Sequence, residues 1–260
     1  MRHFPAESFL KTGVKLVTAM NYTYENNKRV ALITGGTGGL GRILVELFLQ
    51  SGYSVSYSSR QSAGTQSEME LWRCVDAGDS TAHVRFVEEI VSRWGRIDVL
   101  VVNAGVTVDK IIPHLSDSDM DRMLDTNLKG FFTAVKAVLP IMKQQQSGHI
   151  IAVSSFAATA GTYGQSVYAA TKAGIEGAVK SVAREAGEYG VRVNAVMPGF
   201  MDTGMGNKVA DAVREKARQE NVLKRLSSAR ESASFIVFLA GMKQVSGQIF
   251  NLDSRITGWL

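Results

Sequence analysis

The stretch Val30–Gly41, VALITGGTGGLG, decides the fold class of this chain, because it joins a short apolar run to a glycine-rich turn and the start of an amphipathic segment. Glycines in such a turn let backbone amides approach a phosphate. The helix that follows points its partially positive N-terminus at the same place. An ordinary glycine-rich turn is the alternative. The position between strand and helix favours a turn that holds the pyrophosphate of a dinucleotide.

Outward from this turn, short apolar runs alternate with longer segments of helical period almost to the end of the chain. The runs that predict strands are Val30–Thr34, Ser54–Ser58, Leu71–Val75, Ile97–Asn103, His149–Ser154, Val191–Met197 and Gln248–Leu252. The segments that predict helices are Leu40–Gln50, Ser80–Trp94, Asp119–Gln145 and Ser166–Gly187. Crossovers of helical length predict an α/β fold, in which a single doubly wound (Rossmann) domain has a seven-stranded, mainly parallel sheet with helices on both faces.

The domain organisation follows from where this alternation starts and where it is interrupted. The chain has 260 residues, of which 45% are hydrophobic, enough for one sizeable core without disulfides. Organised sequence begins at Arg29, so we expect residues 1–28 to form an N-terminal arm and residues 29–260 to form the domain. Translation from Met1 and translation from Met20 both remain open. Glycines and a separate amphipathic helix interrupt the alternation at residues 202–226, which predicts a substrate lid over the carboxyl edge of the sheet.

Composition and charge exclude several classes of protein. Lysine and arginine number 29 against 24 acidic residues, and this excess of +5 is scattered along the chain, so nucleic-acid binding is not predicted. No run reaches the roughly 18 apolar residues of a membrane span, and no secretory signal is evident, so we expect a cytoplasmic protein. Cys74 lies in an apolar stretch and is expected to be a small buried residue. The four histidines lack ligand spacing, so no metal site is predicted.

The end of the second predicted strand indicates which dinucleotide is bound. A carboxylate there would accept hydrogen bonds from the adenosine ribose of NAD and would repel a 2′-phosphate. The sequence instead reads Ser58-Ser59-Arg60, which supplies hydroxyls and a guanidinium for that phosphate. NADP is therefore predicted, with a solvent-exposed arginine as the alternative. Asp76, after the third strand, is expected to bind the adenine amino group, unless it is a simple turn carboxylate.

Catalytic candidates follow the fourth and fifth strands. Asn103-Ala104-Gly105 allows close backbone approach to a ribose. Tyr168 precedes Lys172 by four residues, so both lie on one helix face, where the ammonium lowers the pKa of the phenol by stabilising the phenolate. Ser155 ends the fifth strand and is placed to hold a substrate carbonyl. A Tyr-x-x-x-Lys pair alone commonly only packs and solvates, but this order of motifs favours catalysis.

Taken together, these motifs resemble the short-chain dehydrogenase/reductase family from about Arg29 to Leu252. The resemblance implies that Asn127, in LDTNLKG, completes a catalytic set with the serine, tyrosine and lysine named above. It also implies that the segment beginning at Pro198 engages the nicotinamide carboxamide. The residues predicted to bind the cofactor are Thr34, Gly35, Thr37, Gly39, Leu40, Gly41, Ser59, Arg60, Asp76, Asn103, Ala104, Gly105, Tyr168, Lys172, Pro198, Gly199, Met201 and Thr203.

By this resemblance the reaction is hydride transfer from NADPH to a ketone carbon while Tyr168 donates a proton to the developing alkoxide. Ser155 is expected to hydrogen-bond the carbonyl oxygen, and Lys172 to bind the nicotinamide ribose and tune the tyrosine. Asn127 is expected to hold a water that links Lys172 to solvent.

Within the family the texture is most similar to 3-oxoacyl-thioester reductases, of the acyl-carrier-protein type in fatty acid synthesis and the acetoacetyl-coenzyme A type. NADP-dependent oxidation or reduction of another secondary alcohol or ketone (sugar, polyol or polyketide) is the main alternative. A non-catalytic NADP-binding protein is the other alternative, and the complete catalytic set argues against it.

Two departures from the family pattern concern partners. Basic residues that usually dock an acidic carrier protein are replaced by Gln144–Ser147 and Glu188–Gly190, so carrier docking is atypical, although Lys143, Arg184 and the basic residues of the lid could substitute. The C-terminal Asp-Gly-Gly becomes Asp253-Ser254-Arg255, which bears on tail packing and subunit contacts. The resemblance implies a homotetramer built through the two long helices, with close approach at Ala169, Ala170, Ala173, Gly174, Gly177 and Ala178. Packing of these small residues against the sheet within one subunit is the alternative.

Overall fold

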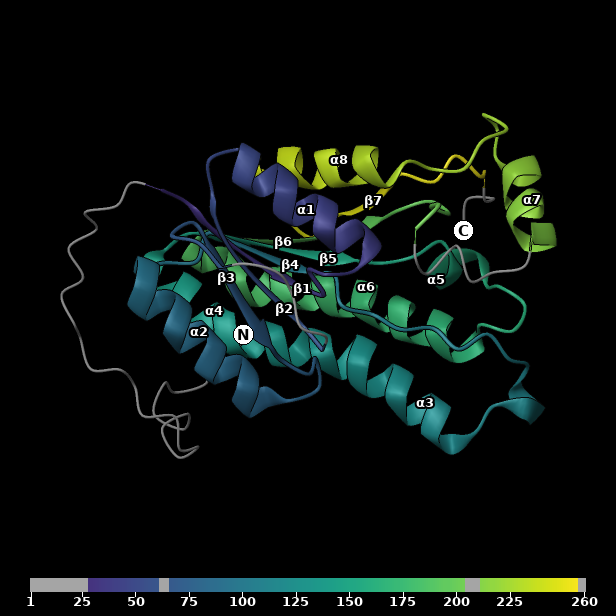
Figure 1. Cartoon of the computed structure of the whole chain (residues 1–260), viewed down its shortest axis with the longest axis horizontal. Coiled ribbons are helices and arrows are strands. Elements are labelled where there is room, and N and C mark those ends of the chain that lie inside the picture. Colours follow the sequence, from purple (N-terminus) through teal and green to yellow (C-terminus); the bar gives the residue numbers. More distant parts are fainter. Residues whose placement is uncertain (1–27, 61–65, 204–210, 257–260) are drawn as a thin grey trace, which may run out of the picture.

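The computed structural model describes residues 28–60, 66–203 and 211–256, and its centre is one parallel sheet (Figure 1). Seven strands lie in the order β3-β2-β1-β4-β5-β6-β7, and every neighbouring pair is parallel. Their bounds are β1 Val30–Thr34, β2 Ser54–Ser59, β3 Glu70–Cys74, β4 Val99–Val102, β5 Gly148–Val153, β6 Val191–Met197 and β7 Ile249–Asn251. The predicted doubly wound sheet is confirmed. The chain adds β2 and β3 on one side of β1, and then adds β4 to β7 on the other side.

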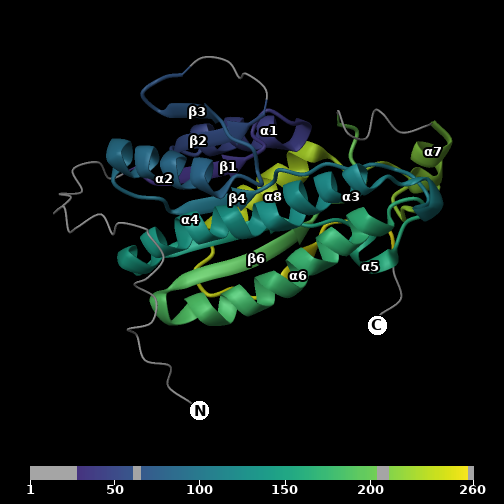
Figure 2. The ribbon, with the colours of Figure 1, turned by 90° about the horizontal axis from the view of Figure 1, so that it is seen from below.

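Helices cover both faces of this sheet. Their bounds are α1 Gly39–Gln50, α2 Ser80–Trp94, α3 Asp117–Met123, α4 Gly130–Gln145, α5 Ala157–Ala160, α6 Ser166–Ala186, α7 Asp211–Glu220 and α8 Ala229–Gly241. Helices α1 and α8 pack together on one face, and α2, α4 and α6 lie on the other (Figures 1 and 2). Short 3₁₀ turns occur at Ile112–His114 and Gly187–Tyr189.

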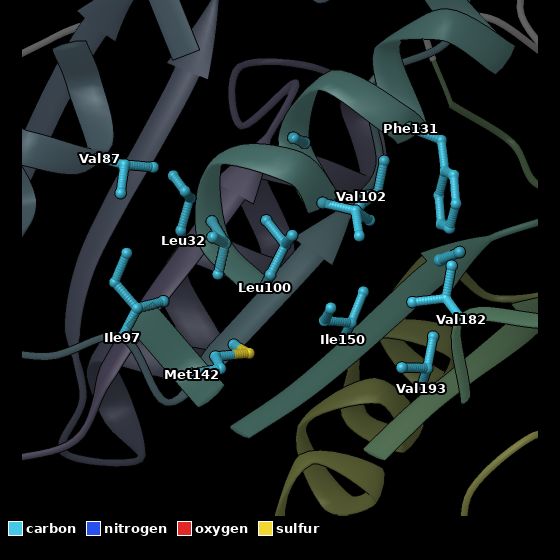
Figure 3. Close-up of a cluster of buried hydrophobic side chains, with 14 of the residues drawn as sticks. Leu32, Val87, Ile97, Leu100, Val102, Phe131, Met142, Ile150, Val182 and Val193 are labelled. Carbon is cyan, nitrogen blue, oxygen red and sulfur yellow. The ribbon is translucent and has the colours of Figure 1, made fainter. Parts of the chain in front are cut away.

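The core is divided by the sheet into two layers. Because successive side chains of a strand point to opposite faces, Leu32, Leu100 and Ile150 pack under α2, α4 and α6 (Figure 3). Their chain neighbours pack under α1 and α8 in the second cluster, which includes Ile33, Val101 and Ile151. Strands β1 and β4 are buried on both faces and read as nearly continuous apolar runs, which is why the sequence identified them readily.

Several element predictions were wrong in detail. The segment Asp119–Gln145 is helical as predicted, but the helix begins at Asp117 and contains a π-helical stretch, Leu124–Lys129, between α3 and α4. Helix α8 was not predicted, and neither was the single-turn α5. Strand β4 is shorter than the predicted strand Ile97–Asn103. Its first residue paired with β1 is Val99, and Asn103 already belongs to the loop that follows it. The amphipathic helix expected within 202–226 is present as α7, while residues 204–210 of that predicted lid lie outside the described residues.

Cys74 is exposed, which contradicts the expectation of a buried residue. It ends β3, an edge strand whose one neighbouring strand among the described residues is β2, so one side of its last residue faces solvent. Among the residues that the structure describes, no helix is long and apolar enough to cross a membrane. The predicted arm at residues 1–28 lies outside the described residues except for Lys28.

Candidate active site

The predicted site residues meet at the carboxyl ends of the central strands. The glycine turn follows β1, Asn103 follows β4, Ser155 follows β5, and Pro198 follows β6. In parallel α/β sheets the crevice for a ligand opens at this edge, where neighbouring strands are followed by connections to opposite faces. The topology therefore brings together residues that are far apart in the sequence.

The glycine turn is held by backbone packing that excludes side chains. Gly35 has a φ of +68°, and a Cβ placed on it would lie 2.9 Å from the Cα of Ala104. A Cβ on Gly41 would lie 2.1 Å from the carbonyl oxygen of Gly35. The N-terminus of α1 has no side-chain cap at Gly38 and no acidic residue in its first turn. The first amides of α1 are therefore left for an external acceptor of negative charge.

Thr34 and Asn103 tie this turn to the loop after β4. The backbone N–H groups of Asn103 and Ala104 both donate to the hydroxyl of Thr34, at 3.0 Å each. The side-chain amide of Asn103 donates to the carbonyl oxygens of Thr34 and Gly35, each at 3.1 Å. Thr34 is buried, so in this structure its hydroxyl positions the two loops that flank the crevice.

Ser59 and Arg60, which are predicted to bind the 2′-phosphate, follow one another at the end of β2 but differ in solvent exposure. Ser59 is buried, and its hydroxyl accepts a hydrogen bond from the indole N–H of Trp72 at 3.0 Å. Arg60 is exposed. Asp76, expected at the adenine, accepts a hydrogen bond from the backbone N–H of Gly78 at 2.9 Å. Asp76 therefore stabilises a turn, and its exposed position leaves it accessible to a ligand as well.

Helix α6 places Tyr168 and Lys172 beside the end of β5. The ammonium of Lys172 lies 5.8 Å from the centre of the Tyr168 ring and donates to the carbonyl oxygen of Val153 at 2.7 Å. Lys172 is 3% exposed and forms no ion pair within the described residues. The hydroxyl of Ser155 hydrogen-bonds the phenol of Tyr168. Serine, tyrosine and lysine thus form one connected cluster.

The electrostatics of this cluster differ from the sequence prediction. Burial raises the pKa of Tyr168, and the hydrogen bond with Ser155 opposes that rise only in part. Burial also lowers the pKa of Lys172 to about 8. The expected lowering of the Tyr168 pKa by Lys172 is therefore not found, because desolvation, which disfavours the charged form of both groups, is the largest influence on each.

Asn127 lies in the π-helical stretch and is 1% exposed. Its side-chain amide donates to the carbonyl oxygen of Val106 and to the hydroxyl of Thr171, and its oxygen accepts from the N–H of Val106. The side chain therefore joins the loop after β4 to the residue before Lys172. Single π-helical turns are frequent at functional sites because they displace backbone groups from the regular ladder. The water-relay role of Asn127 stays a prediction.

The loop after β6 closes the other side of the crevice. Gly199 admits no side chain, since a Cβ there would lie 1.9 Å from the hydroxyl oxygen of Ser227. Thr203 comes close to the N-terminus of α1, with its Cβ 2.6 Å from the position of a Cβ on Gly39. Met201 pairs with Ser227 in an isolated bridge. The structure thus places the predicted nicotinamide loop next to the predicted phosphate turn.

Two residues at the site were missed from the sequence. Thr171 accepts the Asn127 amide and donates to the carbonyl oxygen of Tyr168 at 2.7 Å. The carboxylate of Asp109 acts on Tyr168 through its charge, which raises the tyrosine pKa, and it accepts hydrogen bonds from Thr107 and Gln165. No signal in the sequence distinguished Asp109, because it becomes a neighbour of Tyr168 only through the tertiary fold.

The residues present fit NADP. The uncapped α1 N-terminus suits a pyrophosphate, the exposed guanidinium of Arg60 suits a 2′-phosphate, and the buried Lys172 suits ribose hydroxyls. The end of β2 carries no carboxylate that would oppose the 2′-phosphate.

Comparison with known proteins agrees with this arrangement. The family described as short chain dehydrogenase matches residues 29–214. A 3-oxoacyl-[acyl-carrier-protein] reductase FabG of Thermotoga maritima is 35% identical over 240 residues, which is 88% of this chain and 97% of the relative. An acetoacetyl-CoA reductase of Synechocystis sp. is 34% identical over 228 residues, which is 86% of this chain and 95% of the relative.

Solved structures show the same architecture with varied names. ElxO with NADP bound superposes with a TM-score of 0.81 at 27% identity, covering 87% of this chain and 98% of ElxO. The aldohexose dehydrogenase of Thermoplasma acidophilum superposes with a TM-score of 0.82 at 26% identity, covering 88% of this chain and 93% of that enzyme. The family match spans more than half of the chain, and this chain belongs to the short-chain dehydrogenase family of oxidoreductases.

Proposed function

We propose that the protein is an NADPH-dependent reductase that converts a 3-oxoacyl thioester to the 3-hydroxyacyl thioester. The observation that carries the reaction type is the cluster of Ser155, Tyr168 and Lys172 at the carboxyl edge of the sheet, beside a turn suited to a pyrophosphate. The thioester substrate is supported by the relatives named 3-oxoacyl-[acyl-carrier-protein] reductase and acetoacetyl-CoA reductase.

The nicotinamide cofactor supplies the hydride when it is bound. Arg60 and the hydroxyls around it hold the 2′-phosphate, and the amides at the start of α1 hold the pyrophosphate. Lys172 holds the nicotinamide ribose with its ammonium. The loop from Pro198 to Thr203 binds the carboxamide end, because Thr203 lies against the start of α1 at Gly39, next to the turn that holds the pyrophosphate.

Tyr168 gives its phenolic proton to the substrate oxygen as negative charge develops there. Burial keeps the phenol protonated and available as the acid, while Ser155 holds the carbonyl oxygen beside it. The buried ammonium of Lys172 stabilises the phenolate left after the transfer. Asn127 fixes the position of this lysine through Thr171, the residue before it.

The nature of the acyl carrier is the finer part of the proposal. Gln145, at one expected carrier-docking place, hydrogen-bonds both the N–H and the carbonyl oxygen of Ile97, so it serves the fold. Lys143 lies over the ring of Tyr189, 4.2 Å from its centre. These contacts favour coenzyme A over a docked carrier protein. An aldohexose or another secondary alcohol remains the second candidate, favoured by the structural similarity to aldohexose dehydrogenase.

A homotetramer and a cytoplasmic location also belong to the proposal. On α6, Ala170, Ala173 and Gly177 are exposed rather than packed on the sheet, and Phe132 on α4 is 48% exposed. Exposed small residues on α6 and an exposed aromatic ring on α4 suit close helix approach between subunits. Light scattering measures the assembly directly.

The test compares the loss of NADPH absorbance with acetoacetyl-coenzyme A or a 3-oxoacyl carrier protein with the gain of NADPH absorbance when NADP is supplied with an aldohexose. The proposal expects thioester turnover with the highest kcat/KM. A higher kcat/KM for the hexose would replace it with the second candidate. NADPH binding without turnover of any of these substrates would contradict the thioester assignment and leave the cofactor site in place.

A further inference from the structure

An arginine near the C-terminus occupies a buried position that the sequence comparison left unexplained. Arg255 stands where the family pattern has glycine. Its guanidinium clamps the carboxylate of Asp253, with Nε at 3.0 and 3.1 Å from the two oxygens and Nη2 on Oδ2. The Asp253 side chain is fully buried and that of Arg255 is 13% exposed. A bidentate pair this buried holds the guanidinium plane in one orientation.

One face of the Arg255 guanidinium lies on an aromatic ring next to the proposed catalytic Ser155. The Cζ of Arg255 is 3.6 Å from the centre of the Phe156 ring. Phe156 directly follows Ser155 and is the N-cap residue of α5. The same turn is closed by the backbone N–H of Ala157, which donates to the Ser155 hydroxyl. Through its side chain, Arg255 therefore fixes the turn that presents Ser155.

The backbone of the same segment holds the end of the predicted lid. Arg255 pairs with Asn221 in an antiparallel bridge, and the N–H of Val222 donates to the carbonyl oxygen of Ser254 at 3.1 Å. Asn221 follows α7 directly and is buried. Helices α5 and α7 lie at the same end of the molecule in both views (Figures 1 and 2). Through its side chain Arg255 thus contacts the turn that carries Ser155, and through its backbone it contacts the segment after α7.

We infer that Arg255 is a positioning residue that couples the segment after α7 to the turn carrying Ser155, and so sets how substrate is held. The inference rests on the proposed function only for its kinetic consequence. In structural terms, a substitution at Phe156 changes the hydrogen-exchange rate around Val222, although these two residues belong to different elements. An ion pair that serves folding alone would stabilise Asp253 without linking those elements.

The decisive variant is Phe156→Leu, because it removes the ring and leaves the Arg255–Asp253 pair intact. Cation–π contacts of partly desolvated groups account for roughly three- to tenfold changes in an opening equilibrium. We therefore expect hydrogen exchange at residues 217–227 to become about three- to tenfold faster in this variant. Phe156→Tyr keeps a ring and is expected to restore the native rate. Arg230→Ala, which removes an exposed arginine paired with Glu46, is the control for arginine loss elsewhere.

Arg255 itself is changed in two ways. Arg255→Lys keeps the charge against Asp253 but loses the planar contact, so we expect it to match Phe156→Leu in exchange rate. Arg255→Gly leaves a buried carboxylate unpaired and is expected to lower thermal stability as well. The double variant Phe156→Leu/Arg255→Lys is expected to exchange no faster than either single variant, since both remove one contact.

Kinetics distinguish positioning from folding. In Phe156→Leu we expect the KM of the ketone substrate to rise about three- to tenfold, by the same contact energy, with the NADPH Kd unchanged. Native exchange at residues 217–227 in Phe156→Leu would overturn the inference. Because exchange is measured without substrate, that result is independent of which ketone the enzyme reduces. Faster exchange with unchanged KM would overturn the substrate role.

Discussion

The two halves of the crevice are built by different means. On the side of β1 and β4 the geometry is made by backbone and by glycines whose Cβ positions are already occupied, as at Gly35 and Gly41. At the end of β5 it is made by side chains, with Ser155, Tyr168 and Lys172 in one cluster. A phosphate is recognised by an array of amides, whereas proton transfer needs groups of chosen pKa.

We expect substitutions in the two halves to change different properties of the enzyme. Substitutions in the backbone-built half act through steric clash and therefore on cofactor affinity. Substitutions in the side-chain-built half remove a chemical group without moving the chain, and therefore act on turnover. Binding and turnover measurements on single variants test this difference.

The largest effect is expected at Tyr168. Tyr168→Phe removes the acid without removing the ring, so turnover should fall by roughly 10²–10⁴-fold, the usual contribution of a general acid. NADPH affinity should remain within about twofold, because the phenol gives its proton to substrate and not to the cofactor. Steady-state rates and a fluorescence titration with NADPH check both halves of this expectation. Retained turnover would remove Tyr168 from the mechanism.

A large effect on selectivity is expected at Arg60. Arg60→Ala removes charge-assisted hydrogen bonds to the 2′-phosphate, so the NADPH Kd should rise roughly 10- to 100-fold while that of NADH barely changes. Arg85→Ala, on the exposed side of α2, controls for loss of one positive charge. Calorimetric titration with both cofactors measures the ratio. Equal weakening of NADPH and NADH binding would place Arg60 away from the phosphate.

A smaller change in affinity is expected from a single methyl group in the turn. The Cβ of Gly41→Ala would lie 2.1 Å from the carbonyl oxygen of Gly35, so the turn must open. Overpacking of this kind costs about 1–3 kcal/mol, which predicts a NADPH Kd raised roughly 5- to 100-fold. Gly241→Ala, where a Cβ meets nothing within 4 Å, is the matched control. Unchanged binding in Gly41→Ala would show that the turn does not depend on this contact.

The smallest effect concerns stability in acid and arises outside the crevice, at the amino-terminal end of β5. Burial, with a lesser contribution from Arg192, lowers the pKa of His149 from 6.5 to about 3. Its Nε2 accepts a hydrogen bond from the Asn194 amide at 2.8 Å, which requires the neutral ring. Below pH 6.5 the unfolded chain binds a proton that the folded chain refuses. The free energy of unfolding should therefore fall by up to about 1.4 kcal/mol per pH unit down to about pH 3.

Urea unfolding at a series of pH values measures this slope. His149→Asn removes the titrating ring and should flatten the slope between pH 6.5 and 4, whatever its effect at neutral pH. His114→Asn, at an exposed position, should leave the slope unchanged. An identical slope in all three proteins would assign the acid sensitivity to other groups.

Much of the fold was predictable because its signals are local. Strand β6 was predicted with its observed bounds, since Val191–Met197 is rich in valine and is preceded by the turn at Gly190. Helix α2 was also predicted with its observed bounds, from a Ser/Thr cap at its start and the apolar face at Val87 and Ile90, although the N-cap in the structure is Asp79. Helix α8 was missed because its apolar residues are spread around the helix and give weak periodicity.

The catalytic cluster was predictable as a set of residues, and its electrostatics were not. The spacing of Tyr168 and Lys172 follows from the helix, so their nearness is a local property. The pKa of each depends on burial beneath loops that come from other elements, and the sign for Tyr168 was therefore wrong. Asp109 was missed for the same reason.

The succession of most strands and helices along the chain follows from the sequence alone, and so do the glycine turn and the residue types available for catalysis. Each of these depends on neighbours within a few positions. Only the tertiary structure decided which groups are desolvated, that Asn127 lies in a π-helical turn and that Arg255 joins the Ser155 turn to the segment after α7. These properties depend on contacts between residues far apart in the chain. Periodicity and spacing carry no information about such contacts.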